Sequence, residues 1–154
     1  MNTLFTVNGR KVRLSLHPGQ TLLRVLRDNG YTEVKCGCEE GECGSCTVLL
    51  DGEAVPSCQI LAMSVRNREI TTVKGLMDMD GTSVIPEAFA ETGAVQCGFC
   101  TPGMVLSSYA LLKGNPAPSE EEIKLALDGN ICRCTGYIKI IEAVKLAAVR
   151  MGKK

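Results

Sequence analysis

Lys35-Cys36-Gly37-Cys38-Glu39-Glu40-Gly41-Glu42-Cys43-Gly44-Ser45-Cys46 is the stretch that decides how the first half of the chain folds. Cys38, Cys43 and Cys46 have the spacing C-x4-C-x2-C, and Cys58 follows after eleven intervening residues. Glycines lie between these cysteines, and glycine supplies the bare backbone that a loop around a metal centre requires. Backbone N–H groups turned into such a loop can donate hydrogen bonds to negatively charged sulfur. The stretch therefore predicts a loop in which four thiolates surround one metal centre.

The spacing of these four cysteines favours iron and sulfide over zinc. It is the plant-type ferredoxin spacing, in which four thiolates hold a [2Fe–2S] cluster. A structural zinc site also uses four cysteines, but these more often form two CxxC-type knuckles. A ligand at Cys36 would break the four-residue gap that precedes Cys43. We therefore interpret Cys36 as a spare thiol beside the loop.

The composition is that of a globular protein without an excess of either charge. The chain has 154 residues, enough for one ordinary domain or two small ones, and 45% of them are hydrophobic. Lysine and arginine number 17, as do aspartate and glutamate. No basic surplus therefore points to nucleic acid or to a membrane surface as a partner.

The nine cysteines are interpreted as metal ligands and free thiols, not as a disulfide framework. An odd number of cysteines fits poorly with full pairing. Met1–Arg10 lacks the basic start and apolar run of a signal peptide, and no apolar run approaches the ~20 residues of a membrane span. We therefore expect a cytoplasmic protein without a membrane span, in a compartment that keeps thiols reduced.

The first half of the chain has the pattern of a small mixed sheet crossed by one helix. Alternating segments at Leu4–Val7 and Lys11–Leu16 flank Asn8-Gly9, which is a strong hairpin signal. Thr21 caps an apolar helix that ends near residues 29–30, and the cysteine loop follows. Three further strands are expected at Thr47–Leu50, Glu53–Val55 and Ile70–Val73. This order is that of a β-grasp ferredoxin.

From about Gly75 the apolar period becomes helical. Four helices are expected. The first covers Ile85–Glu91, the second runs from a Thr101 cap to Gly114, and the third runs from a capping box at Ser119 to Leu127. The last helix follows a Thr135 cap, and Ile138 is expected on its buried face. The predicted fold class is therefore α+β. A β-grasp ferredoxin-like [2Fe–2S] domain covers residues 1–76, and a helical-bundle domain covers residues 77–154.

A second set of cysteines lies in the helical half. Cys97 and Cys100 form a CxxC, and Cys132 and Cys134 form a CxC thirty-one residues later. Each pair precedes an expected helix, whose first N–H groups and partial positive charge favour an anionic thiolate site. Taken alone, this pattern leaves both a zinc site and an iron–sulfur cluster open.

The motifs together closely resemble the iron–sulfur part of the molybdenum hydroxylases, a family that includes xanthine dehydrogenase, aldehyde oxidoreductase and carbon monoxide dehydrogenase. The resemblance covers nearly the whole chain and is carried by three stretches: residues 35–48, Val-Gln-Cys-Gly-Phe-Cys-Thr-Pro-Gly at residues 95–103, and Gly-Asn-Ile-Cys-Arg-Cys-Thr-Gly-Tyr at residues 129–137. It implies two [2Fe–2S] clusters. The first is held by Cys38, Cys43, Cys46 and Cys58, and the second by Cys97, Cys100, Cys132 and Cys134.

The resemblance also implies partners. In this family the residues that correspond to Gln96 and Cys134 lie against the molybdopterin. The implied assembly contains a large molybdopterin-binding subunit and a medium FAD-binding subunit, and is a dimer of heterotrimers. The chain would be the electron-transfer subunit of this oxidoreductase, passing electrons from molybdopterin through both clusters to FAD.

The sequence itself carries no catalytic residues for a substrate. It contains neither a dinucleotide-binding glycine motif nor a P-loop, and it is too short to hold flavin and molybdenum domains. Two alternatives stay open at this point. A free-standing ferredoxin-type carrier would expose a polar face near its clusters, whereas a subunit would expose a more apolar one. A zinc-stapled interaction module would be colourless, whereas [2Fe–2S] proteins are red-brown.

Overall fold

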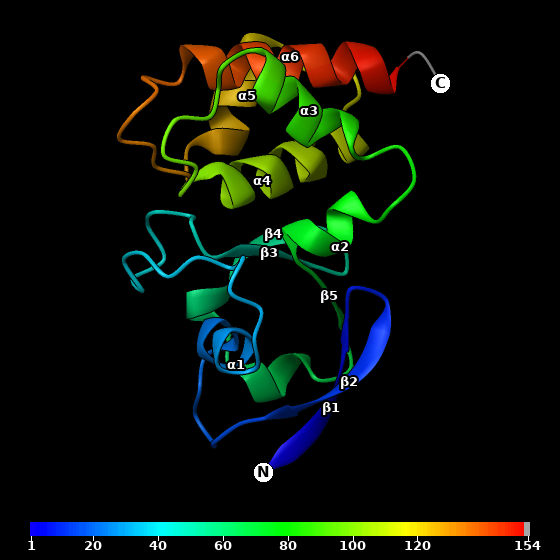
Figure 1. The fold of residues 1–154 in the computed structure, drawn as a ribbon, viewed down its shortest axis with the longest axis vertical. Helices are drawn as coiled ribbons and strands as arrows, with labels where there is room; N and C mark the ends of the chain where they lie inside the picture. Colours follow the sequence, from blue (N-terminus) through cyan, green and yellow to red (C-terminus); the bar gives the residue numbers. More distant parts are fainter. Residues whose placement is uncertain (153–154) are drawn as a thin grey trace.

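The computed structural model describes residues 1–152, and it consists of a sheet-containing half and a helical half. Figure 1 shows the helical half above the sheet, with the chain beginning at the far end of the sheet and returning to the top. Each half has its own cluster of buried apolar side chains. The predicted α+β class, with the sheet first and the helices second, is confirmed.

The sheet has five strands in the order β2-β1-β5-β3-β4. The bounds of these strands are β1 Asn2–Val7, β2 Arg10–Ser15, β3 Thr47–Leu50, β4 Glu53–Pro56 and β5 Glu69–Thr71. Both predicted hairpins are confirmed: β1 pairs antiparallel with β2, and β3 with β4. Because β5 pairs with β1 in parallel and with β3 in antiparallel direction, the sheet is mixed.

Helix α1, Leu22–Asp28, packs into the core of this half. The Thr21 hydroxyl accepts a hydrogen bond from the Arg24 amide, as the sequence predicts, so it satisfies one of the free N–H groups at the helix start. Leu23 and Val25 are fully buried in the same cluster as Phe5 and Ile70. The cysteine loop leaves the end of α1 and is thereby held against a packed core.

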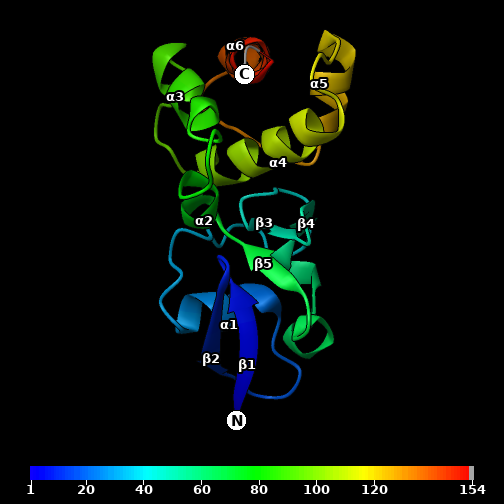
Figure 2. The same cartoon turned by 90° about the vertical axis from the view of Figure 1, so that its right-hand side faces the viewer.

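Within the described residues, 1–152, the helical half contains five α-helices. They are α2 Val73–Met77, α3 Val84–Glu91, α4 Thr101–Gly114, α5 Glu120–Leu127 and α6 Ile138–Met151. Helix α4 lies in the middle, with α3, α5 and α6 on one side and the sheet on the other (Figures 1 and 2). This position explains why α4 is buried on nearly every face, from Met104 through Tyr109. No helix within residues 1–152 is long and apolar enough to cross a membrane.

Three predicted boundaries are wrong. The last strand ends at Thr71, and Val73 begins the short helix α2 instead of continuing the strand. Thr101 is the first residue of α4 and makes no capping bond, because Cys100 occupies the cap position. Thr135 lies before the end of the loop, and α6 begins only at Ile138.

The physical reason at α6 lies in residues 132–137. Tyr137 adopts a left-handed backbone conformation with φ of +69°, so the chain turns once more before the helix begins. Ile138, predicted to be buried, is consequently 67% exposed. The Ser119 capping box is confirmed in full, since its hydroxyl accepts from the Glu122 amide and the Glu122 carboxylate accepts from the Ser119 amide.

Near the cysteine loops, backbone atoms of the two halves pack directly against each other. A Cβ atom on Gly103 would strike the Gly44 carbonyl oxygen and would lie 2.9 Å from Asn130 Oδ1. The Ile131 amide donates a hydrogen bond of 2.9 Å to the Cys43 carbonyl. The predicted division between residues 76 and 77 stays a prediction; it falls inside α2, whose Leu76 packs in the helical core.

Candidate metal centres

The structure brings the four cysteines of the first set together in two pairs. Cys38 and Cys43 lie side by side in the loop: the Cys38 amide points at Cys43 Sγ at 3.4 Å, and the Cys43 amide at Cys38 Sγ at 3.5 Å. Cys46, at the start of β3, and Cys58, in the turn after β4, are buried within hydrogen-bonding reach of each other. The β3–β4 hairpin is what returns Cys58 to the loop.

Backbone donors favour the thiolate form of Cys38, the exposed member of the first pair. Hydrogen bonds from the amides of Glu40, Cys43 and Glu42 lower the pKa of Cys38 to about 7. Burial has the opposite effect on Cys46, whose pKa it raises to about 11. Since the thiolate is the form that binds metal, Cys46 must release its proton when a metal binds.

Gly37 leaves room for these ligands. A Cβ atom at this position would lie 2.7 Å from Cys43 Sγ and 2.6 Å from Ser45 Oγ. The Ser45 hydroxyl itself lies 3.2 Å from Cys43 Sγ. At Gly37 the backbone therefore lies so close to the Cys43 sulfur that even a methyl group does not fit.

The second set is also arranged as two pairs. Cys97 and Cys134 are exposed with their sulfur atoms 3.6 Å apart, and Cys100 and Cys132 lie deeper, within hydrogen-bonding reach of each other. Burial raises the pKa of Cys100 to about 12. At Cys132 burial also acts to raise the pKa, but hydrogen bonds from the Thr135 hydroxyl and from the amides of Thr135 and Cys134 lower it overall.

Paired sulfur atoms fit a [2Fe–2S] cluster, in which each iron takes two of the four cysteines. Among residues 1–152, no three cysteine, histidine or acidic side chains gather around a single metal-ion position. Thr101 Oγ1, next to Cys100, is buried without a hydrogen-bond partner in the described chain, so it is a spare donor beside the second set. The donor sets therefore suit two two-iron clusters, each of which supplies one-electron chemistry when bound.

Both ligand sets line one hollow of about 210 Å³. It is bounded by Cys38 and Cys43 from the first set and by all four cysteines of the second. The backbone hydrogen bond from Ile131 to Cys43 connects the two sets, since Ile131 directly precedes Cys132. The two predicted sites are therefore neighbours, joined by one hydrogen bond between two ligand-bearing segments.

The remaining predicted residues lie at the edges of these sets. Gln96 is exposed beside Cys97, and its side chain makes no hydrogen bond within residues 1–152. Cys36 lies outside both pairs and donates to Glu39 Oε1 at 3.2 Å. Burial first, and then the Glu39 carboxylate, raise the pKa of Cys36, so it stays a thiol.

Sequence reasoning missed three polar groups that contact the ligands. Gln59 Nε2 lies 3.4 Å from Cys58 Sγ, and Ser45 Oγ and Thr135 Oγ1 lie 3.2 and 3.1 Å from Cys43 and Cys132. All three lie within three residues of a ligand in the sequence. That proximity was the available signal, but which hydroxyl or amide turns toward sulfur depends on the loop conformation.

Comparisons with known proteins assign both halves. The family model described as "2Fe-2S iron-sulfur cluster binding domain" matches residues 5–72. The model described as "[2Fe-2S] binding domain" matches residues 72–145. Two iron–sulfur domains, one in each half, are therefore shown, and the zinc alternative has no support.

Two curated relatives match this chain over about nine tenths of both lengths, and a third matches it over a small part of a longer protein. It is 48% identical to the nicotinate dehydrogenase small FeS subunit of Eubacterium barkeri, over 94% of this chain and 92% of that one. It is 45% identical to the xanthine dehydrogenase iron-sulfur-binding subunit of Escherichia coli O157:H7, over 90% and 89%. It also matches 11% of the length of the xanthine dehydrogenase of Emericella nidulans, at 41% identity over 92% of this chain.

Solved structures agree with the sequence relatives. The quinoline 2-oxidoreductase from Pseudomonas putida 86 superposes with a TM-score of 0.92 at 39% identity, over 99% of this chain and 96% of that one. The aldehyde oxidoreductase from Desulfovibrio desulfuricans ATCC 27774 gives 0.89 at 41% identity, over 99% of this chain and 17% of that one. The chain belongs to the small iron–sulfur subunits of the molybdenum hydroxylase family, whose members transfer electrons within oxidoreductase complexes.

Proposed function

We propose that this subunit carries electrons from a molybdopterin centre on a large partner subunit to FAD on a medium partner subunit. One [2Fe–2S] cluster is held by Cys38, Cys43, Cys46 and Cys58. The other is held by Cys97, Cys100, Cys132 and Cys134. The paired sulfur atoms and the inward-pointing amides described above support these ligand sets.

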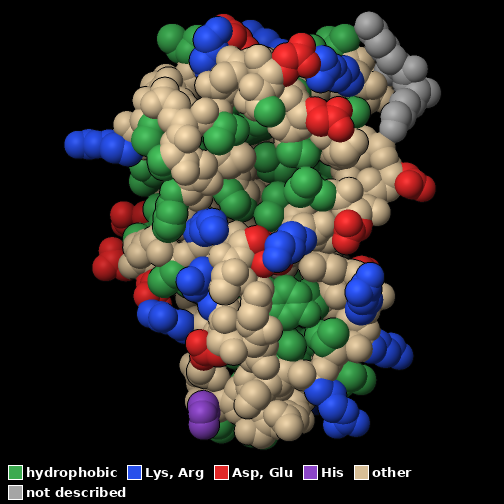
Figure 3. All heavy atoms as spheres, viewed as in Figure 1, with side chains coloured by type: hydrophobic (Ala, Val, Ile, Leu, Met, Phe, Trp, Pro, Cys, Tyr) green, Lys and Arg blue, Asp and Glu red, His purple; other side chains and the backbone are tan. Residues whose placement is uncertain are grey.

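The observation that carries the proposal is the apolar surface around the exposed pair of the second set. Val95, Phe99 and Ile131 are 39%, 47% and 54% exposed, and the last two line the hollow that also holds Cys97 and Cys134. Hydrophobic side chains gather in the helical half on the face that Figure 3 shows. Large apolar side chains beside a redox ligand favour a surface covered by a partner over the polar face of a free carrier.

The order that we propose for the two sites rests on Gln96 and Cys134 and on the family resemblance. Gln96 and Cys134 lie at the open edge of the second set, where an amide can both donate to and accept from a pterin edge. We therefore assign the helical-domain site to the molybdopterin side and the ferredoxin-like site to the FAD side. The hydrogen bond from Ile131 to Cys43 links the two ligand loops and fixes their spacing.

Gln96→Ala in the purified complex tests this order. The expected result is slower reduction of the clusters by the substrate of the complex, with reoxidation through the flavin nearly unchanged. Stopped-flow absorbance separates the two steps. Gln59→Ala is the matched control, since Gln59 lies against Cys58 on the proposed flavin side and should leave the substrate-driven step unchanged.

The opposite pattern would reverse the order. A Gln96→Ala complex that is reduced by substrate at the normal rate, but slow in its flavin step, would place the helical-domain site next to FAD. Two zinc ions in place of four irons and four sulfides per chain would reject the electron-transfer role altogether.

We also propose that the complex is a dimer of heterotrimers in the cytoplasm. Relatives named as small subunits support a multi-subunit assembly. Nine free cysteines within the described chain support a reducing compartment. Light scattering of the co-purified complex measures its mass, and a single heterotrimer would contradict the dimer.

A further inference from the structure

Three hydrogen bonds form a closed cycle within the six residues Cys132–Tyr137, which begin with the first cysteine of the CxC. The Cys132 amide donates to the Tyr137 hydroxyl at 2.8 Å, and the Tyr137 amide donates to Thr135 Oγ1 at 3.3 Å. The Thr135 hydroxyl in turn donates to Cys132 Sγ at 3.1 Å. The cycle begins and ends on the same ligand cysteine.

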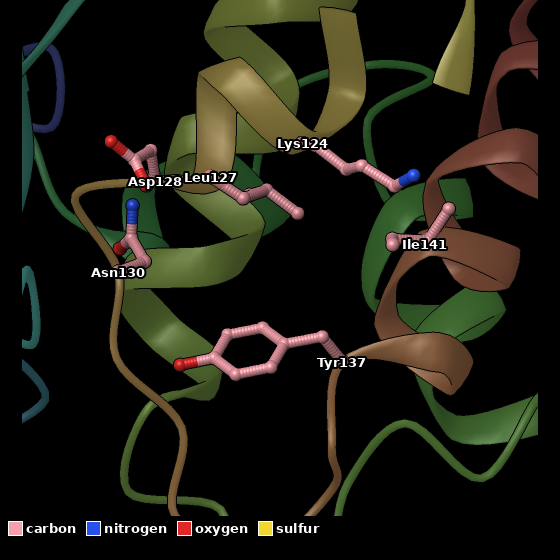
Figure 4. Close-up of a pocket in the computed structure, with 6 residues that line it drawn as sticks. All are labelled: Lys124, Leu127, Asp128, Asn130, Tyr137 and Ile141. Atoms are coloured by element: carbon pink, nitrogen blue, oxygen red, sulfur yellow. The ribbon is translucent and has the colours of Figure 1, made fainter. Parts of the chain in front are cut away.

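The backbone and the side chain of Tyr137 both help to keep this cycle of hydrogen bonds in one arrangement. Tyr137 adopts a left-handed conformation that is uncommon for a bulky residue, with φ of +69°. Its ring lies across a cavity of about 250 Å³ between α5 and α6, and the hydroxyl turns toward the loop that runs on from Asn130 (Figure 4). The hydrogen bond from the Cys132 amide to the Tyr137 hydroxyl therefore helps to hold this strained backbone in place.

The direction of the Thr135 hydrogen bond follows from its neighbours. Thr135 Oγ1 already accepts from the Tyr137 amide, so the hydroxyl hydrogen is free to point at sulfur. Cys132, which accepts this hydrogen bond, is only 8% exposed, and a hydrogen bond is stronger in buried surroundings than in water. Thr135 is thus a fixed donor aimed at a ligand sulfur.

We propose that Thr135 tunes the reduction potential of the helical-domain site and that Tyr137 is the residue that positions it. Hydrogen bonds to the sulfur atoms are one of the factors that set the potential of an iron–sulfur cluster. Reduction adds negative charge, which a donor at Cys132 Sγ stabilises. Thr135 therefore raises the potential of this site relative to the same site without the hydroxyl. This inference rests on the ligand set of the proposed function.

Thr135→Val removes the donor and keeps the shape of the side chain. Redox titration monitored by electron paramagnetic resonance should show the helical-domain signal shifted to a more negative potential, with the other signal unmoved. Thr135→Ser, which keeps a hydroxyl, should restore the potential. Thr92→Val is the matched control, because the Thr92 hydroxyl bonds the Ala88 carbonyl in α3 and not a ligand.

Tyr137→Phe tests the positioning role separately. It keeps the ring in the cavity and removes the acceptor of the Cys132 amide, so the helical-domain potential should shift while the other stays constant. Tyr109→Phe makes the same chemical change in α4, away from both ligand sets, and should shift neither potential. A Tyr137→Phe potential equal to that of the unaltered chain would remove Tyr137 from the proposal.

The outcomes of the threonine series each decide the question. An unshifted potential in Thr135→Val with full iron content would overturn the tuning role. Loss of iron from both Thr135→Val and Thr135→Ala would overturn it as well, since the hydroxyl would then be needed for assembly. These results are distinct from a failure of the proposed function, in which the unaltered chain itself would lack two iron–sulfur signals.

Discussion

Gly37 shows how a single position decides whether the cysteine loop can hold its ligands. The Cβ of any other residue would come within 2.7 Å of Cys43 Sγ. This contact is closer than packed atoms tolerate, so either the sulfur or the loop must move. The glycine is therefore required by the space around the ligand.

Gly37→Ala should lower the iron content of the ferredoxin-like half. The expected result is a loss of about half of the four irons, with the signal of the helical-domain site retained. Gly114→Ala is the matched control, because a Cβ there meets nothing within 4 Å and its backbone is helical. Iron and acid-labile sulfide analysis checks both variants. Four irons per chain in Gly37→Ala would show that the loop can shift to accommodate the methyl group.

Cys36→Ala should keep both clusters. The Cys36 thiol bonds Glu39 and lies outside the two sulfur pairs of its half, so its removal costs no ligand. Analysis should still find four irons and four sulfides per chain. A count that falls by half would identify Cys36 as the ligand in place of Cys38.

At the scale of single elements, α5 is a helix whose start is fixed by its own side chains. The capping box of Ser119 and Glu122 satisfies amides at the first turn. Helix α3 begins at Val84, and Ser83 at its cap position makes no side-chain capping bond. The two helices are both eight residues long, so they allow the contribution of a cap to be compared directly.

Ser119→Ala should destabilise α5 by about 1 kcal/mol, because the loss of a capping hydroxyl exposes an unpaired amide. Ser83→Ala, the control, should change the stability of α3 by only a few tenths of a kcal/mol, since no cap is lost. Hydrogen exchange of the amides in each helix measures these local free energies. Equal effects in both helices would contradict a specific contribution of the capping box.

At the scale of the whole molecule, the contact between the two halves sets the spacing of the two sites. Gly44 and Gly103 allow the cysteine loop to approach the start of α4 at backbone distance. Asn130, held by a bond of 2.9 Å from its amide to Ser107 Oγ, lies against the same contact. The two halves are therefore joined by shape and by the Ile131–Cys43 hydrogen bond.

Gly103→Ala should push the two ligand loops apart. The added methyl group meets the Gly44 carbonyl, a backbone atom that cannot rotate away. We expect each site to keep its own spectrum, while the magnetic interaction between the two reduced clusters weakens. Gly129→Ala, at the same junction but with nothing within 4 Å of its Cβ, is the control. An unchanged interaction in Gly103→Ala would show that the halves adjust without separating.

The sequence by itself determined the class of fold, and together with the family resemblance it predicted both sets of cysteine ligands. Cysteine spacing and turn residues are short-range sequence patterns, so they predict the structure of short segments. The two hairpins, the Thr21 cap and the Ser119 capping box were predicted for this reason and are present. The α+β class followed from the change of period after Gly75, and it too is confirmed.

Only the tertiary structure decided where the loops end and what faces the sulfur atoms. Thr135 and Thr101 look like helix caps in sequence, yet Thr135 turns to Cys132 and Thr101 lies inside α4. Tyr137 takes a left-handed conformation, and its hydroxyl accepts a hydrogen bond from the Cys132 amide, a contact that no local propensity predicts. The pairing of the sulfur atoms and the meeting of Gly44 with Gly103 likewise join segments far apart in the chain, so packing alone determines them.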